Sequence, residues 1–265
     1  MTSLTRPSLL DAIVAATRHT VQVRAASQPL SALEREVRRR PDGAAFERAV
    51  RSAKAPRVIA ECKRRSPSRG ILRHNYMPAA HARAYASAGA AAISVLTEPT
   101  FFDGSLDHLR QVRQAVDLPL LRKDFIVTEY QLVEAAAAGA DAVLLIVAAL
   151  PTGALPALVR GAADLGLASV VEVHDAGDIP AAVDAGARII GVNSRDLRTL
   201  AVHPAALEDA AARLPGQVAK IAESGIRERA DLDRLSAMGY DAFLVGERLI
   251  AQQDPGAALR DLCSA

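Results

Sequence analysis

One pattern recurs along this chain: a helical segment ends at a glycine, and a short run of apolar residues follows at once. Glycine just beyond a helix ends it in the left-handed conformation, and a short apolar run bounded in this way is typical of a buried strand. The pattern occurs as SAGAAAISVL at 87–96, AAGADAVLLI at 137–146, DLGLASVVEV at 164–173, DAGARIIGVN at 184–193 and AMGYDAFLVG at 237–246. The chain is therefore built from repeated helix–strand units.

Three further segments complete the series of strands. RVIAEC at 57–62 opens it, and LPLLRK at 118–123 and QVAKIAE at 217–223 lie between helical segments at a similar spacing. Strands that are apolar on both faces and alternate with helices indicate a parallel sheet. Eight such units in 265 residues predict an α/β fold, a closed (β/α)8 TIM barrel. A doubly wound open sheet is the alternative, but no GxGxxG or P-loop sequence follows any of these strands.

Helical segments precede the first strand. In SLLDAIVAATRHTV at 8–21 the apolar residues recur near helical spacing, and 31–38 and 43–53 also have helical character. We expect one domain over 1–265, in which a helical N-terminal extension at 1–55 caps a barrel at 56–265.

Charged and amide residues stand at the carboxyl ends of the expected strands, where TIM barrels carry their catalytic groups. Glu61 and Lys63 share one face of their strand, because residues i and i+2 point the same way. Taken by themselves, Glu61 and Lys63 could be an ion pair that only stabilises the barrel. Burying charge is costly, however, so a whole rim of such groups indicates an active site. The rim residues are Glu61, Lys63, Lys123, Glu172, Asn193 and Glu223, with Arg195 just beyond the sixth strand.

Two glycine-containing segments follow the last two strands. They are ESGI at 223–226 and VGERLI at 245–250, in the loops where barrels of this kind often bind phosphate through backbone N–H groups. Gly225 and Gly246 would let the backbone approach an anion closely. The alternative is that both are ordinary glycines between a strand and a loop.

The composition argues against several other functions. A net charge of +2 and the absence of Trp leave little with which to hold and stack nucleic acid. The basic run at 35–40 is interpreted as the exposed face of a short helix, and Cys62 and Cys263 have no metal or redox spacing. No apolar run approaches the ~18 residues of a membrane span, and MTSLTRPSLL at 1–10 lacks the features of a signal peptide. We expect a cytoplasmic protein without nucleic-acid or membrane partners.

Several segments, in their order and spacing, closely resemble the indole-3-glycerol phosphate synthase family of tryptophan biosynthesis. They are IAECKRRSPS, SVLTEPTFFDGS, LLRKDFI, VEVH, GVNSRDL, ESGI and FLVGE. The resemblance covers nearly the whole chain. It implies conversion of 1-(2-carboxyphenylamino)-1-deoxyribulose 5-phosphate into indole-3-glycerol phosphate, carbon dioxide and water, without a metal or cofactor. The six histidines are scattered and form no ligand cluster, which agrees with a reaction that needs no metal. His174 is interpreted as a hydrogen-bonded residue at a strand end.

The resemblance also implies roles for individual residues. Lys123 matches the general acid at the substrate carbonyl, Lys63 a second lysine that holds the substrate carboxylate, and Glu172 a base for the dehydration. Glu61, Asn193 and Glu223 match residues that position sugar hydroxyls and tune the lysines. The remaining matches are contacts to the substrate (Ser66, Phe102, Phe125, Arg195 and Leu197) and to its phosphate (Ser224, Gly225, Gly246 and Glu247).

Two residues depart from the family pattern. Glu247 stands where some relatives have a hydroxyl residue, so backbone N–H groups must supply the phosphate contacts there. Arg248 stands where a small residue is expected. It either offsets the charge of Glu247 or lies on the helix surface.

Two other functions stay open at this point. Another phosphate-binding barrel enzyme, either an aldolase with Lys123 as Schiff-base nucleophile or a sugar-phosphate isomerase, would share the fold and the phosphate loops. A non-catalytic regulatory barrel is the second, although it would have little use for a full set of acids and bases. We expect a monomeric enzyme that acts on a phosphorylated small molecule.

Overall fold

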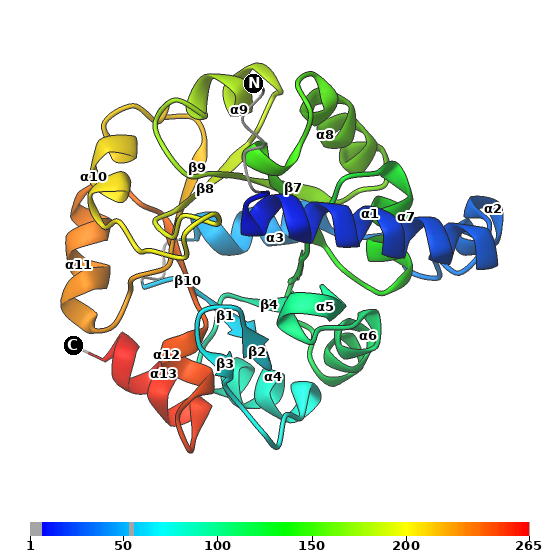
Figure 1. Cartoon of the computed structure of the whole chain (residues 1–265). Helices are drawn as coiled ribbons and strands as arrows, with labels where there is room; N and C mark the ends of the chain where they lie inside the picture. Colours follow the sequence, from blue (N-terminus) through cyan, green and yellow to red (C-terminus); the bar gives the residue numbers. More distant parts are fainter. Residues whose placement is uncertain (1–6, 53–55, 265) are drawn as a thin grey trace.

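The computed structural model describes residues 7–52 and 56–264, and its centre is a closed barrel of parallel strands (Figure 1). Its strands are β1 (Val58–Cys62), β4 (Ala92–Leu96), β5 (Leu120–Lys123), β6 (Ala142–Ile146), β7 (Ala168–Val173), β8 (Ile189–Asn193), β9 (Ala219–Glu223) and β10 (Ala242–Val245). Each pairs with its neighbours in chain order, and β10 closes the barrel against β1. The predicted (β/α)8 barrel is confirmed.

Helices follow the strands and cover the outside of the barrel (Figure 1). They are α4 (Pro78–Ser87), α5 (Pro99–Phe102), α6 (Leu106–Ala115), α7 (Glu129–Ala137), the 3-10 helix η1 (Val147–Ala149), α8 (Ala154–Asp164), α9 (Ile179–Asp184), α10 (Ala205–Ala211), α11 (Arg229–Ala237), α12 (Glu247–Ile250) and α13 (Pro255–Cys263). In the loop after β1, β2 (Arg65–Ser66) and β3 (Gly70–Ile71) form a small antiparallel pair.

The glycines of the recurring pattern adopt the backbone conformation that the pattern requires. Each has a positive φ, between 80° and 91°, where a residue with a Cβ would be strained. They are Gly89, Gly139, Gly166, Gly186 and Gly239. Each helix therefore ends at a fixed point, and the following apolar residues enter the barrel directly.

The N-terminal extension contacts both ends of the barrel. Helix α1 (Leu9–Ser27) crosses the face seen in Figure 1 and packs against α5, α7 and η1, which follow strand ends. Helix α3 (Gly43–Arg51) packs against β4, β7 and β9, with Phe46 and Val50 fully buried. The N–H of Gly43 donates to the carbonyl of Gly166, just before β7.

The second predicted helix of the extension is shorter than expected. Helix α2 covers Leu30–Glu34, so the basic run at 35–40 is exposed chain after the helix and not a helix face. Pro41 follows the run, and a proline makes the helical conformation unfavourable for the residue before it. Residue 53, at the end of the third predicted helix, and residues 1–6 of the segment compared with a signal peptide lie outside the described residues.

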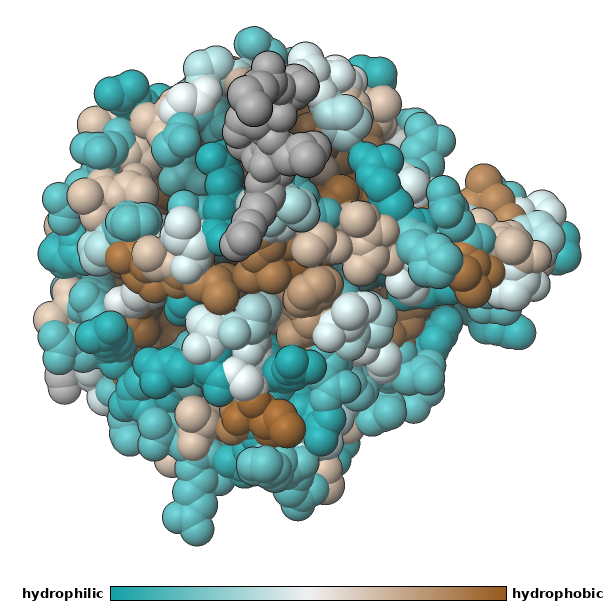
Figure 2. Space-filling model, viewed as in Figure 1, coloured by the Kyte–Doolittle hydropathy of each residue, from teal (hydrophilic) through white to brown (hydrophobic). Residues whose placement is uncertain are grey.

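The face crossed by α1 carries hydrophobic residues near its centre, beside that helix, and hydrophilic residues over most of the remainder (Figure 2). No helix in the described part of the chain has both the length and the apolar character needed to cross a membrane.

Candidate active site

All the residues predicted to act on substrate line one cavity of about 360 Å³ at the carboxyl ends of the strands. The barrel register aligns them, because Lys123 lies opposite Leu96, and Asn193 lies opposite Glu223 in the adjacent strands. The structure brings together Glu61, Lys63, Ser66, Phe102, Lys123, Phe125, Glu172, Asn193, Arg195, Leu197, Glu223, Ser224, Gly225, Gly246 and Glu247.

Lys123 lies between two glutamates inside the barrel. Its Nζ is 3.0 Å from Glu172 Oε2 and 3.0 Å from Glu223 Oε2. Both carboxylates are 1% exposed, whereas the Lys123 side chain is 13% exposed. The ammonium is therefore the member of this group that solvent or a ligand can reach.

The three groups differ in their protonation. Burial lowers the pKa of Lys123, but the charges of Glu172, Glu223 and Glu61 outweigh it and hold that pKa above its ordinary value. At Glu172 burial is outweighed by Lys123 and His174, so the pKa lies below its ordinary value. At Glu223 burial prevails over the ammonium, and the charge of Glu172 adds to it, which raises the pKa to about 8. Of the two carboxylates, Glu223 therefore takes up a proton more readily than Glu172.

A second lysine faces the same cavity. Glu61 and Lys63 form an ion pair, and their side chains are 4% and 15% exposed. Gly246 packs against this pair, because a Cβ at that position would overlap Glu61 Oε2. Gly191 in β8 makes room for Glu223 Oε1 in the same way. Two glycines in the barrel wall therefore leave space for two carboxylates.

The loop after β8 is ordered by the end of that strand. Asn193 Oδ1 accepts hydrogen bonds from Ser224 Oγ at 2.8 Å and from the backbone N–H of Arg195 at 3.0 Å. The Arg195 guanidinium donates to the carbonyl of Leu200 at 2.9 Å. Arg195 therefore orders its own loop, while also lining the cavity.

One wall of the cavity is apolar. The rings of Phe102 and Phe125 lie 6.1 Å apart between centroids, and Leu197 also lines the cavity. Buried Glu98 accepts hydrogen bonds from three backbone N–H groups of α5, including that of Phe102 at 3.1 Å, and so fixes the Phe102 backbone. Sequence reasoning did not identify several other apolar wall residues, Leu96, Leu144, Ile146, Leu200 and Leu244.

The glycine loops form the opposite end of the cavity. Ser224 and Gly225 both have positive φ, 66° and 74°, so the chain turns sharply after β9. Gly246 precedes α12, whose first turn leaves backbone N–H groups without partners inside the helix. Such groups can bind an anion.

Glu247 is neutralised by residues that the sequence did not indicate. Arg69 Nε lies 2.8 Å from one carboxylate oxygen, and the Arg195 guanidinium lies 3.8 Å from the other. Of the two alternatives for Arg248, the contacts favour a place on the surface, since Arg248 Nε donates to the carbonyl of Arg227 at 3.1 Å. Arg69 comes from the loop after β1, and only the folded chain brings that loop to α12.

His174 lies beside Glu172, but its ring nitrogens lack hydrogen-bond partners in the described residues. Its backbone N–H donates to Asp178 Oδ2 at 3.1 Å, and its Nε2 lies 3.3 Å from Glu172 Oε1. Within the described residues neither ring nitrogen has a hydrogen-bond partner, so the predicted hydrogen bonding holds for the backbone alone. Over the same residues, no cluster of three or more His, Cys, Asp or Glu side chains is arranged to hold a metal ion.

The site combines a charged rim, a wall with two phenylalanine rings and two glycine loops. Such a site suits a substrate with an aromatic ring at one end and a phosphate at the other, with proton transfer between them.

Comparisons with solved structures agree with the fold. The chain is similar to thiamine phosphate pyrophosphorylase from Pyrococcus furiosus, with a TM-score of 0.59 and 18% identity over 78% of this chain and 93% of that one. It is also similar to N-acetylmannosamine-6-phosphate 2-epimerase from Clostridium perfringens, with a TM-score of 0.58 and 15% identity over 72% and 86%. At these identities the likeness concerns the fold alone.

Sequence comparisons are more specific. Residues 10–262 match the family described as indole-3-glycerol phosphate synthase. The chain is 48% identical to indole-3-glycerol phosphate synthase 1 of Streptomyces coelicolor, over 97% of this chain and 96% of that protein. It is 45% identical to indole-3-glycerol phosphate synthase of Burkholderia vietnamiensis, over 95% and 97%. The family match spans the charged rim, the aromatic wall and both glycine loops, and this chain belongs to the indole-3-glycerol phosphate synthase family.

Proposed function

We infer that the chain is a decarboxylating carbon–carbon lyase that makes indole-3-glycerol phosphate, carbon dioxide and water from 1-(2-carboxyphenylamino)-1-deoxyribulose 5-phosphate. In this reaction the ring carbon that bears the carboxylate attacks the ribulose carbonyl. Carbon dioxide then leaves, and loss of water produces the pyrrole ring. The cavity residues supply proton transfer and binding, which are the functions that this reaction requires.

We assign the first proton transfer to Lys123. A weakly nucleophilic arene attacks a carbonyl only when the developing oxyanion is protonated or stabilised. The Lys123 ammonium is the exposed member of the buried group, and flanking carboxylates hold its pKa high. A Schiff-base lysine needs the opposite, a lowered pKa that leaves a neutral amine. This single observation favours the synthase reaction over the aldolase alternative.

We assign the late base to Glu172. Dehydration requires one group that accepts a ring-derived proton and another that protonates the departing hydroxyl. Of the two buried carboxylates beside Lys123, Glu172 has the lowered pKa and Glu223 the raised one, so Glu172 is the more readily ionised of the two. Lys63, on the same rim, is assigned to the substrate carboxylate and then to the departing hydroxyl.

The remaining site residues are assigned to binding. Glu61, Asn193 and Glu223 position the sugar hydroxyls and the two lysines, and Phe102 and Phe125 hold the aromatic ring with Leu197. The phosphate binds to backbone N–H groups at Ser224, Gly225, Gly246 and Glu247. Ser66 and Arg195 complete the substrate contacts. This account uses no metal and no organic cofactor.

We also infer a monomeric cytoplasmic enzyme without nucleic-acid partners. The net charge of +2 is too small to attract a polyanion strongly. In the described part of the chain the exposed large apolar side chains are Val23, Leu30, Ile71 and Met77.

A direct assay tests the proposed reaction. The purified protein is incubated with the carboxyphenylamino-deoxyribulose phosphate in the presence of a chelator, while indole fluorescence and carbon dioxide are measured. We expect equal amounts of both products. A Schiff-base adduct trapped by borohydride, or an isomerised sugar phosphate without carbon dioxide, would instead support the alternative functions.

Replacement of Gly246 tests the packing around Glu61. The sequence alone suggests that such a change would mainly weaken phosphate binding. Because a Cβ would overlap Glu61 Oε2, we expect Gly246→Ala to displace the Glu61–Lys63 pair and to lower kcat by roughly tenfold or more, with a smaller change in KM. Gly216→Ala is the matched control, since a Cβ there meets no atom within 4 Å. A rise in KM at constant kcat would contradict this expectation and would show that Gly246 acts mainly in phosphate binding.

The arginines near Glu247 give a second prediction. Removing Arg69 leaves Glu247 less well neutralised beside the phosphate, so Arg69→Ala should raise KM by about 2- to 5-fold. Arg248→Ala should leave KM nearly unchanged, because Arg248 contacts a backbone carbonyl. Steady-state kinetics of both variants provide the measurement, and equal values of KM would contradict the assignment.

A further inference from the structure

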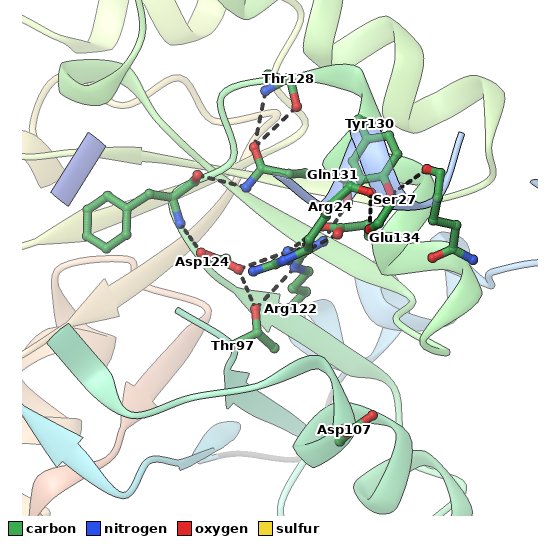
Figure 3. A network of polar contacts seen from close by, with 12 residues as sticks. Arg24, Ser27, Thr97, Asp107, Arg122, Asp124, Thr128, Tyr130, Gln131 and Glu134 are labelled. Carbon is green, nitrogen blue, oxygen red and sulfur yellow. Dashed lines mark hydrogen bonds and ion pairs between the residues drawn. The ribbon is translucent and has the colours of Figure 1, made fainter. Parts of the chain in front are cut away.

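A buried arginine lies directly before the proposed acid. Arg122 is 0% exposed and is the largest fully buried side chain in the described residues. Successive residues of a strand point to opposite faces, so Lys123 faces the cavity while Arg122 faces outward, toward α7. Figure 3 shows the Arg122 guanidinium among polar groups from several elements. Burial of a charge at this position calls for an explanation, because it rarely adds stability.

The guanidinium of Arg122 donates hydrogen bonds to four residues. Its Nε donates to Thr97 Oγ1 at 3.1 Å, and one terminal nitrogen donates to the carbonyl of Gln131 at 2.7 Å. The other terminal nitrogen donates to Asp124 Oδ2 at 2.9 Å and Glu134 Oε2 at 3.1 Å. Arg122 therefore joins the end of β4, the loop after β5 and helix α7.

The same group fixes the backbone of a cavity wall residue. Asp124 Oδ1 accepts from the N–H of Phe125 at 2.8 Å, and Gln131 Nε2 donates to the carbonyl of Phe125 at 3.0 Å. Both partners of Phe125 are themselves bound to Arg122 (Figure 3). The Phe125 backbone is thus connected to the guanidinium through both of its neighbours in this group.

Within the barrel sheet, Lys123 is paired with a residue of β4 but not with one of β6. In the pairing with β4, Lys123 lies opposite Leu96, and its carbonyl accepts from the N–H of Thr97 at 3.1 Å. In the pairing with β6 the register ends one residue earlier, at Arg122 opposite Val143. The side-chain bonds of Arg122 hold the strand end where the ladder has stopped.

Helix α1 is connected to this arrangement. One terminal nitrogen of Arg24 lies 3.0 Å and 3.1 Å from the two carboxylate oxygens of Glu134. Glu134 Oε2 also accepts from Arg122, so a single carboxylate joins the N-terminal extension to β5. The Arg24 side chain is 28% exposed, whereas Glu134 is 3% exposed.

We propose that Arg122 is a positioning residue: through Asp124, Gln131 and Glu134 it holds Lys123 and Phe125 in their catalytic arrangement and couples α1 to it. This role rests on the proposed function, since Lys123 must be the proton donor for its position to affect the reaction. A misplacement of about 1 Å at a reacting group can cost roughly 10²-fold in rate.

The chain contains a matched control at the other end of the same strand. Asp141 accepts from the guanidinium of Arg113 at 3.1 Å, from Arg39 at 2.7 Å and from the backbone N–H of Leu120 at 3.0 Å. This group also joins a buried carboxylate, arginines and β5, but it contains no residue of the cavity. Loss of either group should lower stability, whereas only loss of the Arg122 group should alter the active site.

The experiment compares Arg122→Lys with Arg113→Lys. We expect both to lower the thermal midpoint, and only Arg122→Lys to lower kcat, by roughly 10- to 10²-fold with little change in KM, when assayed well below both midpoints. Arg24→Gln removes a half-buried partner of Glu134 and should lower kcat less, in the same direction, which keeps the test available if Arg122→Lys does not fold. A parental kcat in Arg122→Lys and Arg24→Gln would overturn the proposal.

A second measurement does not depend on turnover. In protein labelled at lysine, the NMR signal of the Lys123 side chain should shift in Arg122→Lys and stay at its parental position in Arg113→Lys, each variant adding one lysine. An unmoved Lys123 signal would overturn the positioning role. Failure of the parental protein to convert the substrate would contradict the proposed function and leave this comparison intact.

Discussion

Lys123→Met is expected to lower kcat by roughly 10²- to 10⁴-fold, the range for removing one positioned proton donor. Ring closure is the first chemical step, so carbon dioxide release and indole formation should fall together. Substrate affinity should change less, because the phosphate and carboxylate contacts come from other residues. Methionine has a similar length but cannot donate a proton, and its uncharged chain fits between carboxylates only if these take up protons.

Lys63→Met is the matched control for this variant. Lys63 lies in the same cavity and pairs with Glu61, so a general loss of positive charge would affect both variants alike. We expect Lys63→Met to raise KM more than Lys123→Met does, since Lys63 is assigned to the substrate carboxylate. Near-parental turnover of Lys123→Met in a steady-state fluorescence assay would show that another group is the acid.

Glu172→Gln should separate the later steps from the first one. Glutamine keeps the shape of the side chain but cannot accept the proton, so we expect dehydration to slow more than ring closure, by roughly 10²-fold or more. In rapid-quench experiments with labelled substrate, carbon dioxide should appear faster than indole. A decarboxylated intermediate that has not yet lost water should accumulate between them.

Glu223→Gln provides the comparison for Glu172→Gln. Glu223 lies at the same distance from Lys123, but burial raises its pKa, so it takes up a proton more readily than Glu172 does. Glutamine should therefore replace it at a smaller cost. If carbon dioxide and indole appear together in Glu172→Gln at one lowered rate, with no intermediate, Glu172 is not the late base.

The barrel and the rim could be predicted because each depends on local sequence. A glycine such as Gly139 ends its helix wherever the chain lies, and the apolar run after it must be buried. Strand alternation then determines which residues face inward, as for Glu61 and Lys63. The family resemblance added the reaction and the roles of individual residues, which alternation alone does not indicate.

Other features depend on contacts between distant segments and could not be predicted from one sequence. Arg69 reaches Glu247 only because the loop after β1 lies beside α12, and the sequence suggested the adjacent Arg248 instead. In the sequence Gly191 resembles any other glycine of a strand, and only the structure shows that the Glu223 carboxylate packs against it. Arg122, next to the proposed acid, likewise gives no indication of its partners on α7 and α1.

The most direct test of the central claim is the protonation state of Lys123. The chain has four lysines, Lys54, Lys63, Lys123 and Lys220, so protein labelled at the lysine side chain should give a simple NMR spectrum that single Lys→Arg variants assign. Because Glu172, Glu223 and Glu61 raise its pKa, we expect the Lys123 signal to remain that of an ammonium above pH ~10.4, where free lysine is half deprotonated, for as long as the protein stays folded. A Lys123 signal that titrates near neutral pH would reveal a neutral amine suited to imine formation, and would contradict the assignment of Lys123 as the proton donor.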